Sequence, residues 1–134
     1  MSMFSIFNVS SSAVSAQAQR LNVVASNLAN VDAVAGPDGK AYKARQVVFQ
    51  TQAMGADQSA GVKVTAIQES DLPGRKTHDP SNPLADAEGY VTHSNVNAVE
   101  EMVNMISASR SYQNNVEVMN TAKTLLLKTL QMGQ

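Results

Sequence analysis

Residues 98–130 read AVEEMVNMISASRSYQNNVEVMNTAKTLLLKTL. Apolar residues recur here at alternating steps of four and three, which is the a/d heptad spacing of a helix that packs against another helix along a narrow seam. Asn97 and Glu100 precede and open the pattern as a capping box, and Gly133 follows as a C-terminal stop. We therefore predict a long C-terminal helix. Its seam positions are Ala98, Met102, Met105, Ser109, Tyr112, Val116, Met119, Lys123, Leu126 and Leu130.

The same spacing occurs at the other end of the 134-residue chain. It predicts a first helix that ends near Asn30 and Val31, where we expect Asn27 and Asn30 to hydrogen-bond backbone groups. The seam positions of this helix are Phe4, Phe7, Ser11, Val14, Ala18, Leu21, Ala25 and Leu28.

Two seams of one period at opposite ends of a chain predict an antiparallel pair. The expected fold is therefore mainly α, an antiparallel coiled coil of long N- and C-terminal helices with a small β-rich insert between them. The residues expected to face one another across the pair are Val14, Leu21 and Leu28 on one helix and Met105, Tyr112, Val116 and Leu126 on the other.

The middle of the chain loses the helical period. Gly36-Pro37-Asp38-Gly39 is a tight-turn sequence, and residues 41–52 and 61–70 carry short β-like runs. Prolines make residues 71–90 extended rather than helical. We expect residues 1–31 and 98–134 to form the helical core domain, with residues 32–97 as an insert at one end of the pair.

Charge is unevenly distributed along the chain. Charged residues make up 16% of the sequence, and Arg20 is the single one among residues 1–31. A helix with small uncharged side chains nearly all round can pack on several sides, so we expect it to be surrounded by other subunits. The net charge of −1 provides no basic excess for nucleic-acid binding.

Sequence motifs for chemistry are few. The chain has no cysteine, and we expect no cleaved signal peptide, because the N-terminus lacks a basic region before an unbroken apolar run. No run of 18 apolar residues predicts a membrane span. His78 and His93 lack metal-ligand spacing, so we expect no metal, cofactor or catalytic site. The enzyme alternative is a hydrolase that uses Ser94 and His93. It is disfavoured, because two residues that are merely neighbours in sequence do not make a catalytic arrangement.

Two motifs resemble a known family. The stretch Ser26, Asn27, Leu28, Ala29 and Asn30 resembles the Ser-Asn-(Leu/Ile)-Ala-Asn signature of the bacterial flagellar axial proteins, the rod, hook and hook-associated group. The order and spacing of further stretches, from Gln46-Val47-Val48-Phe49-Gln50 onward, are similar to those of the proximal-rod type over the whole chain. The strongest of these stretches contains Ser109, Arg110, Tyr112 and Gln113.

The resemblance implies a structural subunit of the proximal rod of the flagellar basal body. Such subunits polymerise into a helical tube that crosses the periplasm and transmits torque to the hook. They are exported by the flagellar type III apparatus, and their partners are copies of themselves, other proximal and distal rod subunits, the rod–MS-ring junction protein and the rod cap or muramidase. The residues expected at intersubunit and coiled-coil contacts are Phe4, Phe7, Val14, Leu21, Leu28, Met102, Met105, Tyr112, Val116, Met119, Leu126 and Leu130.

A protein of another class remains an alternative. A cytoplasmic helical hairpin with a regulatory or chaperone-like role would share the two seams. It would form a discrete dimer and carry charged residues beside its seams. The N-terminal seam of this chain lacks such charged flanks.

Overall fold

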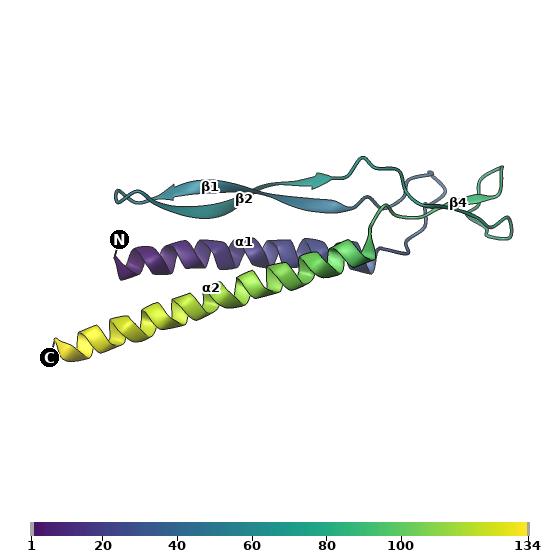
Figure 1. Cartoon of the computed structure of the whole chain (residues 1–134). Helices are drawn as coiled ribbons and strands as arrows, with labels where there is room; N and C mark the ends of the chain where they lie inside the picture. Colours follow the sequence, from purple (N-terminus) through teal and green to yellow (C-terminus); the bar gives the residue numbers. More distant parts are fainter. Residues whose placement is uncertain (1, 134) are drawn as a thin grey trace.

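The computed structural model describes residues 2–133, in which two long helices are joined through two small antiparallel sheets (Figure 1). The predicted terminal helices and the β insert between them are confirmed. No helix within residues 2–133 has an apolar stretch long enough to cross a membrane. The elements in chain order are α1 (Met3–Ala29), β1 (Arg45–Met54), β2 (Ser59–Glu69), β3 (Lys76–His78), β4 (Tyr90–Thr92) and α2 (Ala98–Met132).

Capping residues define where the two helices begin and end. The Ser2 hydroxyl accepts a hydrogen bond from the Ser5 amide at the start of α1, and Asn30 caps its end as predicted. The Asn97 side chain accepts hydrogen bonds from the amides of Val99 and Glu100 at the start of α2. The described residues show no return bond from the Glu100 side chain, so only the Asn97 half of the predicted capping box forms.

The two helices run antiparallel and diverge toward the end of α2 (Figure 1). Their contact line is made of small side chains, because Ala16, Ala108 and Ala122 are buried while many large apolar residues are not. A core of alanines lets the two backbones approach closely but buries little apolar surface. Heptad coiled-coil packing of this pair stays a prediction.

The β1–β2 hairpin lies along α1, on the side opposite α2 (Figure 1). Its strands pair antiparallel from Arg45↔Glu69 to Met54↔Ser59, with a register shift between Val48 and Phe49. The prediction that the whole insert sits at one end of the helix pair is therefore wrong. Only the β3–β4 lobe lies at that end.

A close backbone approach explains why the hairpin docks on α1. Gly61 of β2 is buried, and a Cβ atom added there would lie 2.6 Å from the Ser12 hydroxyl of α1. That hydroxyl accepts a hydrogen bond from the Val62 amide at 3.1 Å. A small side chain on α1 facing a glycine on β2 allows this contact, which a periodicity analysis does not detect.

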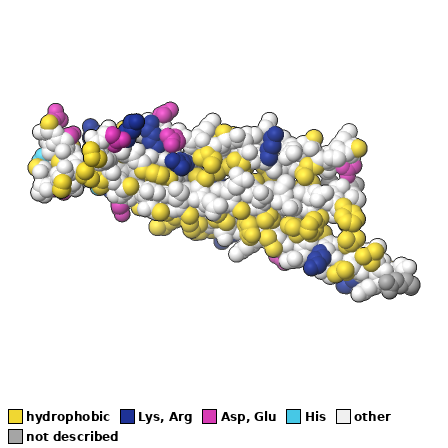
Figure 2. Space-filling model, turned by 180° about the vertical axis from the view of Figure 1, so that it is seen from behind, with side chains coloured by type: hydrophobic (Ala, Val, Ile, Leu, Met, Phe, Trp, Pro, Cys, Tyr) yellow, Lys and Arg dark blue, Asp and Glu magenta, His cyan; other side chains and the backbone are white. Residues whose placement is uncertain are grey.

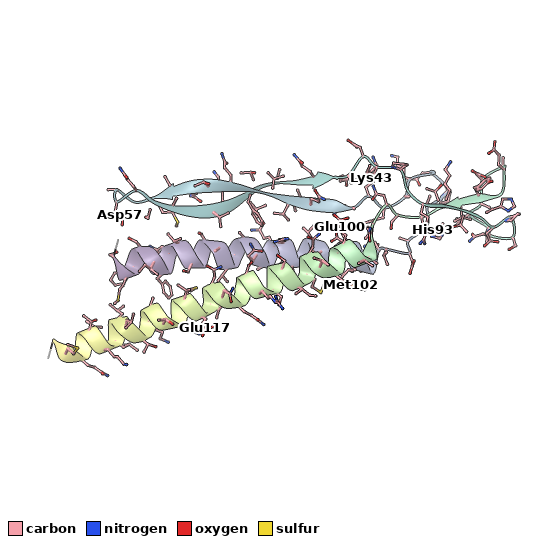
Figure 3. The ribbon with its side chains drawn as sticks, viewed as in Figure 1. Lys43, Asp57, His93, Glu100, Met102 and Glu117 are labelled. Atoms are coloured by element: carbon pink, nitrogen blue, oxygen red, sulfur yellow. The ribbon has the colours of Figure 1, made fainter. Side chains whose placement is uncertain are left out.

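The tip of the hairpin is joined to the start of α1 (Figure 3). The Ser5 hydroxyl donates a hydrogen bond to the Asp57 carboxylate at 2.9 Å. The first turn of α1 has no acidic residue of its own. Asp57 therefore places a negative charge at the positive end of the helix dipole.

This contact predicts an acid-sensitive hairpin tip. Hydrogen bonds from Ser5 and Ser59 hold the pKa of Asp57 below its ordinary value of 3.8. A lowered folded pKa adds stability above the unfolded value, and that stability is lost as the pH falls through the folded value. We expect the protection of the tip amides against exchange, relative to the intrinsic rate at each pH, to fall below pH 3.8, while protection near Arg45 does not follow it. Asp57→Asn should remove the pH dependence; an unchanged profile in that variant would contradict the assignment.

The small lobe is organised around one buried valine. β3 and β4 pair from Lys76↔Thr92 to His78↔Tyr90, and Val91 between them is almost fully buried. Val34 forms an isolated bridge to His93, which ties the segment after α1 to this lobe. Residues 71–90 contain no helix, as predicted, but residues 80–84 and 87–89 form turns, so the segment is only partly extended.

Candidate functional site

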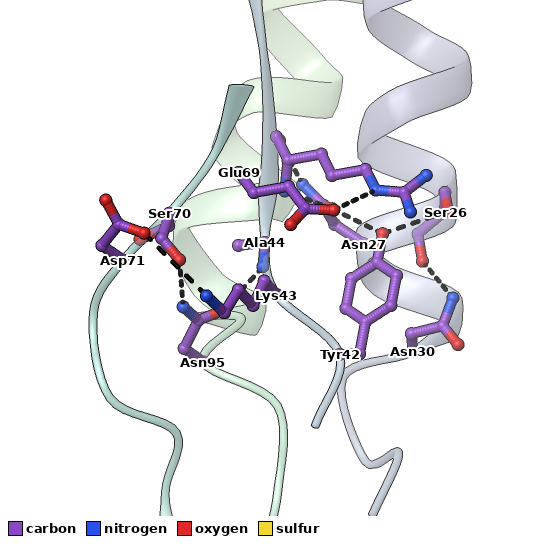
Figure 4. Close-up of polar contacts among 11 residues, drawn as sticks. Ser26, Asn27, Asn30, Tyr42, Lys43, Ala44, Glu69, Ser70, Asp71 and Asn95 are labelled. Carbon is purple, nitrogen blue, oxygen red and sulfur yellow. Dashed lines mark hydrogen bonds and ion pairs between the residues drawn. The ribbon is translucent and has the colours of Figure 1, made fainter. Parts of the chain in front are cut away.

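Near the end of α1, the buried Asn27 side chain contacts Tyr42 and the start of β1 (Figure 4), and it also contacts α2. The Asn27 amide nitrogen donates hydrogen bonds to the Arg45 carbonyl at 2.8 Å and to the Glu101 carboxylate at 3.1 Å. Its amide oxygen accepts hydrogen bonds from the Arg45 amide at 3.0 Å and the Tyr42 hydroxyl at 2.9 Å. All four hydrogen-bonding positions of the side chain are therefore satisfied. We call Asn27 and these three partners the polar hub.

Glu101 is the acidic member of the polar hub. It lies on the inner face of α2, and only 6% of its surface is exposed. Within residues 2–133 its carboxylate has no ion-pair partner, and Asn27 is its hydrogen-bond donor. A carboxylate buried in this way depends on its single donor, because an unpaired buried charge is strongly destabilising.

Polar contacts around the hub hold the base of the hairpin. The Arg45 guanidinium lies 3.6 Å from the Glu69 carboxylate across the first β1–β2 pair. The Arg45 guanidinium carbon also lies 5.7 Å from the centre of the Tyr42 ring. Asn95 accepts a hydrogen bond from the Ala44 amide and donates to the carbonyls of Ser70 and Leu72. The hub therefore joins α1, α2 and the start of β1 in one connected network.

The first family motif is largely part of this network. Ser26 shares a hydrogen bond with Tyr42, and the Asn30 side chain donates to the Ser26 carbonyl, which confirms the expected backbone bond of Asn30. Leu28 is half-buried and Ala29 is exposed. Asn27 bonds the backbone where β1 begins, rather than where α1 ends.

The second family motif lies away from the hub, farther along α2. Ser109 and Tyr112 are half-buried there, whereas Arg110 and Gln113 are exposed. The structure therefore does not bring the two motifs into one site. Glu101 and Tyr42 complete the hub instead. The separation of 74 residues between Asn27 and Glu101 hides their contact from any local pattern.

The predicted packing residues fall into two groups. Exposed members are Phe4, Phe7, Met102 and Leu130. Half-buried members are Val14, Leu21, Leu28, Met105, Tyr112, Val116, Met119 and Leu126. The positions on α2 that are most buried, Glu101, Ala108 and Ala122, stand one residue before the predicted seam positions Met102, Ser109 and Lys123. The intervals of seven and fourteen residues that separate Glu101, Ala108 and Ala122 also separate Met102, Ser109 and Lys123, so spacing alone does not distinguish the two lines.

An apolar face of α2 is exposed near the hub. Val99, Met102, Val103 and Ile106 are 71%, 55%, 61% and 54% exposed. Their spacing of i, i+3, i+4 and i+7 places them on one side of the helix. Figure 3 shows Met102 on the side of α2 turned away from the hairpin. These four residues are the outer face of α2.

A second apolar region lies where α2 extends beyond α1. Met3 of α1 lines two grooves, of about 440 and 410 Å³, and Ala122 lines both as well. Lys123, Leu125 and Leu126 each line one of these grooves beside Met3, so residues 127–132 are the part of α2 that continues past the start of α1. Figure 2 shows hydrophobic side chains gathered along the lower side of the molecule toward this end. The exposed apolar residues of this overhang are Leu127, Leu130 and Met132.

Ser94 and His93 lie against the backbone segment that follows α1, rather than in a catalytic arrangement. The Ser94 hydroxyl donates a hydrogen bond to the Val31 carbonyl at 2.7 Å, and the Ser94 amide donates to the Ala33 carbonyl. His93 Nδ1 is buried without a hydrogen-bond partner among the described residues. The hydroxyl and the imidazole are therefore not joined in the way that nucleophilic catalysis requires.

Comparisons with known proteins agree with these features. Residues 7–37 match the family model described as flagella basal body rod protein, and residues 87–132 match the model described as flagellar basal body rod FlgEFG protein C-terminal. Relatives named flagellar basal-body rod protein FlgC are 57% identical in Escherichia coli O6:H1, 55% in Salmonella typhimurium and 58% in Yersinia enterocolitica, each over the full length of both chains. They confirm the resemblance to the axial proteins and do not favour a helical-hairpin regulator. The chain therefore belongs to the family of flagellar basal-body rod proteins FlgC, structural subunits of the flagellar rod.

Proposed function

We propose that this chain is a subunit of the proximal rod that polymerises into a helical tube across the periplasm and carries torque from the motor to the hook. The exposed outer face of α2 is the observation that supports this role. Monomeric proteins rarely expose a contiguous apolar stripe of this kind, because water disfavours it. A neighbouring helix would cover Val99, Met102, Val103 and Ile106 together.

The placement of α1 makes α2 the main contact surface for neighbours. The hairpin covers one side of α1 and α2 covers another, which leaves α1 a narrow exposed strip with Phe4 and Phe7 at its start. α2 has no strand packed on it within the described residues. Its outer face is therefore free to contact another subunit.

The overhang supports a position inside a wall of packed helices. Its six residues extend roughly 9 Å past the start of α1, from the helical rise of about 1.5 Å per residue. Leu125, Leu126 and Leu127 are consecutive, so they point to different sides of the helix. A helix that is apolar on several sides is stable only when surrounded. Neighbouring subunits would supply that surrounding.

The division of the chain follows from these surfaces. Residues 1–31 and 98–134 form the helical core that packs into the tube wall, and residues 32–97 form the insert. Within one subunit, Val14, Leu21 and Leu28 pack toward α2. The residues of α2 that pack toward them are Met105, Tyr112, Val116, Met119 and Leu126. Phe4, Phe7, Met102 and Leu130 contact neighbouring subunits.

The family supports further parts of the proposal. The chain is exported by the flagellar type III apparatus without a cleaved signal and acts as a structural subunit rather than an enzyme. Its partners are copies of itself, other proximal and distal rod subunits, the junction protein to the MS ring, and the rod cap or muramidase. Each contact is a helix-packing surface, so the role requires no cofactor, nucleic acid or membrane span.

Charge substitution on the outer face of α2 tests the proposal. Val103→Glu places a carboxylate on an exposed position, so the stability of the isolated chain should change by no more than about 0.5 kcal/mol. In a motile strain carrying only this variant, we expect swimming to be lost and basal bodies to lack the subunit. Val103→Leu, the matched apolar control, should swim normally. Normal swimming of the Val103→Glu strain would overturn the assignment of this face to assembly.

A further inference from the structure

α2 carries two overlapping seams, and the structure uses the less apolar one. The buried or half-buried line contains Glu101, Ala108, Asn115 and Ala122. The line one residue later contains Met102, Ser109, Val116 and Lys123. Both lines share Met105, Tyr112, Met119 and Leu126. Successive residues of an α-helix lie about 100° apart around its axis, and the two lines share half of their positions. A rotation of α2 about its own axis by about half a residue position, roughly 50°, would therefore exchange them.

The rotation of α2 determines which apolar residues face outward. In the structure Glu101 faces α1 and Met102 is exposed. Rotation toward the other seam would bring Met102 against α1 and turn Glu101 into solvent. The outer face available to a neighbouring subunit would then lose Met102.

Asn27 is the group that distinguishes the two settings. In the observed setting its second amide hydrogen is donated to Glu101 at 3.1 Å. In the other setting Met102 would replace Glu101, and that buried hydrogen would have no acceptor. Burying a polar group without a partner is costly. One turn farther along α2, the Arg20 guanidinium donates to the Asn104 side chain at 3.5 Å, which favours the same setting.

We propose that the Asn27–Glu101 pair sets the rotation of α2 and thereby selects the apolar face that the rod subunit presents to its neighbours. The buried polar pair favours one packing arrangement of the two helices over others, just as a single buried asparagine fixes the register of a coiled coil. The part that concerns neighbours rests on the function proposed above. The rotation itself is a property of the isolated chain.

The variant Asn27→Leu tests whether the Asn27–Glu101 pair sets the rotation of α2. With its donor removed, the Glu101 carboxylate is unpaired when buried, so α2 should turn it into solvent and bring Met102 inward. The natural chain has no cysteine, so Met102→Cys and Ala108→Cys each introduce a single thiol. We expect the Asn27→Leu change to slow maleimide labelling at position 102 and to speed it at position 108, each by about tenfold.

The opposite directions separate rotation from simple loosening. A variant that only loses stability would label faster at both positions, and that result would overturn the proposal. Asn27→Leu combined with Glu101→Leu provides the control, because an apolar pair suits the original setting. It should restore slow labelling at position 108 and fast labelling at position 102. Labelling of the purified chain does not depend on rod assembly. The labelling test can therefore fail while the proposed rod function stands, and the rod function can fail while the labelling test succeeds.

Discussion

Replacing Asn27 by alanine is expected to lower the free energy of unfolding by about 3 kcal/mol. The change removes four hydrogen bonds at a side chain that has no exposed surface. It leaves the Glu101 carboxylate and the backbone groups of Arg45 without their partner. Each buried group left without a partner adds to the loss.

Denaturant unfolding of the purified chain measures this effect. Asn30→Ala is the matched control, because Asn30 lies three residues farther along and its side chain makes one hydrogen bond, to the Ser26 carbonyl. We expect that variant to lose about 1 kcal/mol. Equal losses in the two variants would show that Asn27 does not organise the fold.

Replacing Gly61 by valine is expected to displace the β1–β2 hairpin from α1. A Cβ atom at this position would lie 2.6 Å from the Ser12 hydroxyl and would also meet the Met54 sulfur. The added methyl groups of valine increase the overlap. Overpacking of this kind costs about 1–3 kcal/mol, and the hairpin can relieve it by moving away from the helix.

Amide exchange at Val62 reports this displacement, because its amide donates to the Ser12 hydroxyl. We expect exchange there to increase in Gly61→Val. Ala60→Val is the matched control, since Ala60 is the preceding residue of β2 and is exposed. Unchanged protection of Val62 in Gly61→Val would contradict the close approach.

The two helices and the two strands of the hairpin were predictable because their signals are local, whereas the short strands β3 and β4 were not predicted. The 3–4 spacing of apolar residues, the Asn97 cap and the stop at Asn30 depend on residues within one or two turns of one another. The β-like runs at 41–52 and 61–70 became β1 and β2 within a few residues. The family motif ending at Asn30 was also readable as a continuous stretch of sequence.

The rotation of α2 was not predictable from the apolar period. That period places Met102 inside, because methionine is apolar and glutamate is charged. The structure instead buries Glu101, whose donor lies on the other helix 74 residues away. A contact between distant residues leaves no trace in a local pattern, so the apolar period does not predict that Glu101 is buried.

By itself, the amino-acid sequence determined the two helices, the two strands of the hairpin, the scarcity of charge in residues 1–31 and the family to which the chain belongs. Tertiary structure alone decided that the hairpin lies along α1, that Asn27 binds Glu101 and that Met102 faces outward. The physical reason is that periodicity records which side of a helix is apolar, whereas docking depends on shape and on satisfying each buried polar group. The close fit between Ser12 and Gly61 determines how the hairpin docks on α1, and the hydrogen bonds of Asn27 determine how α2 is rotated.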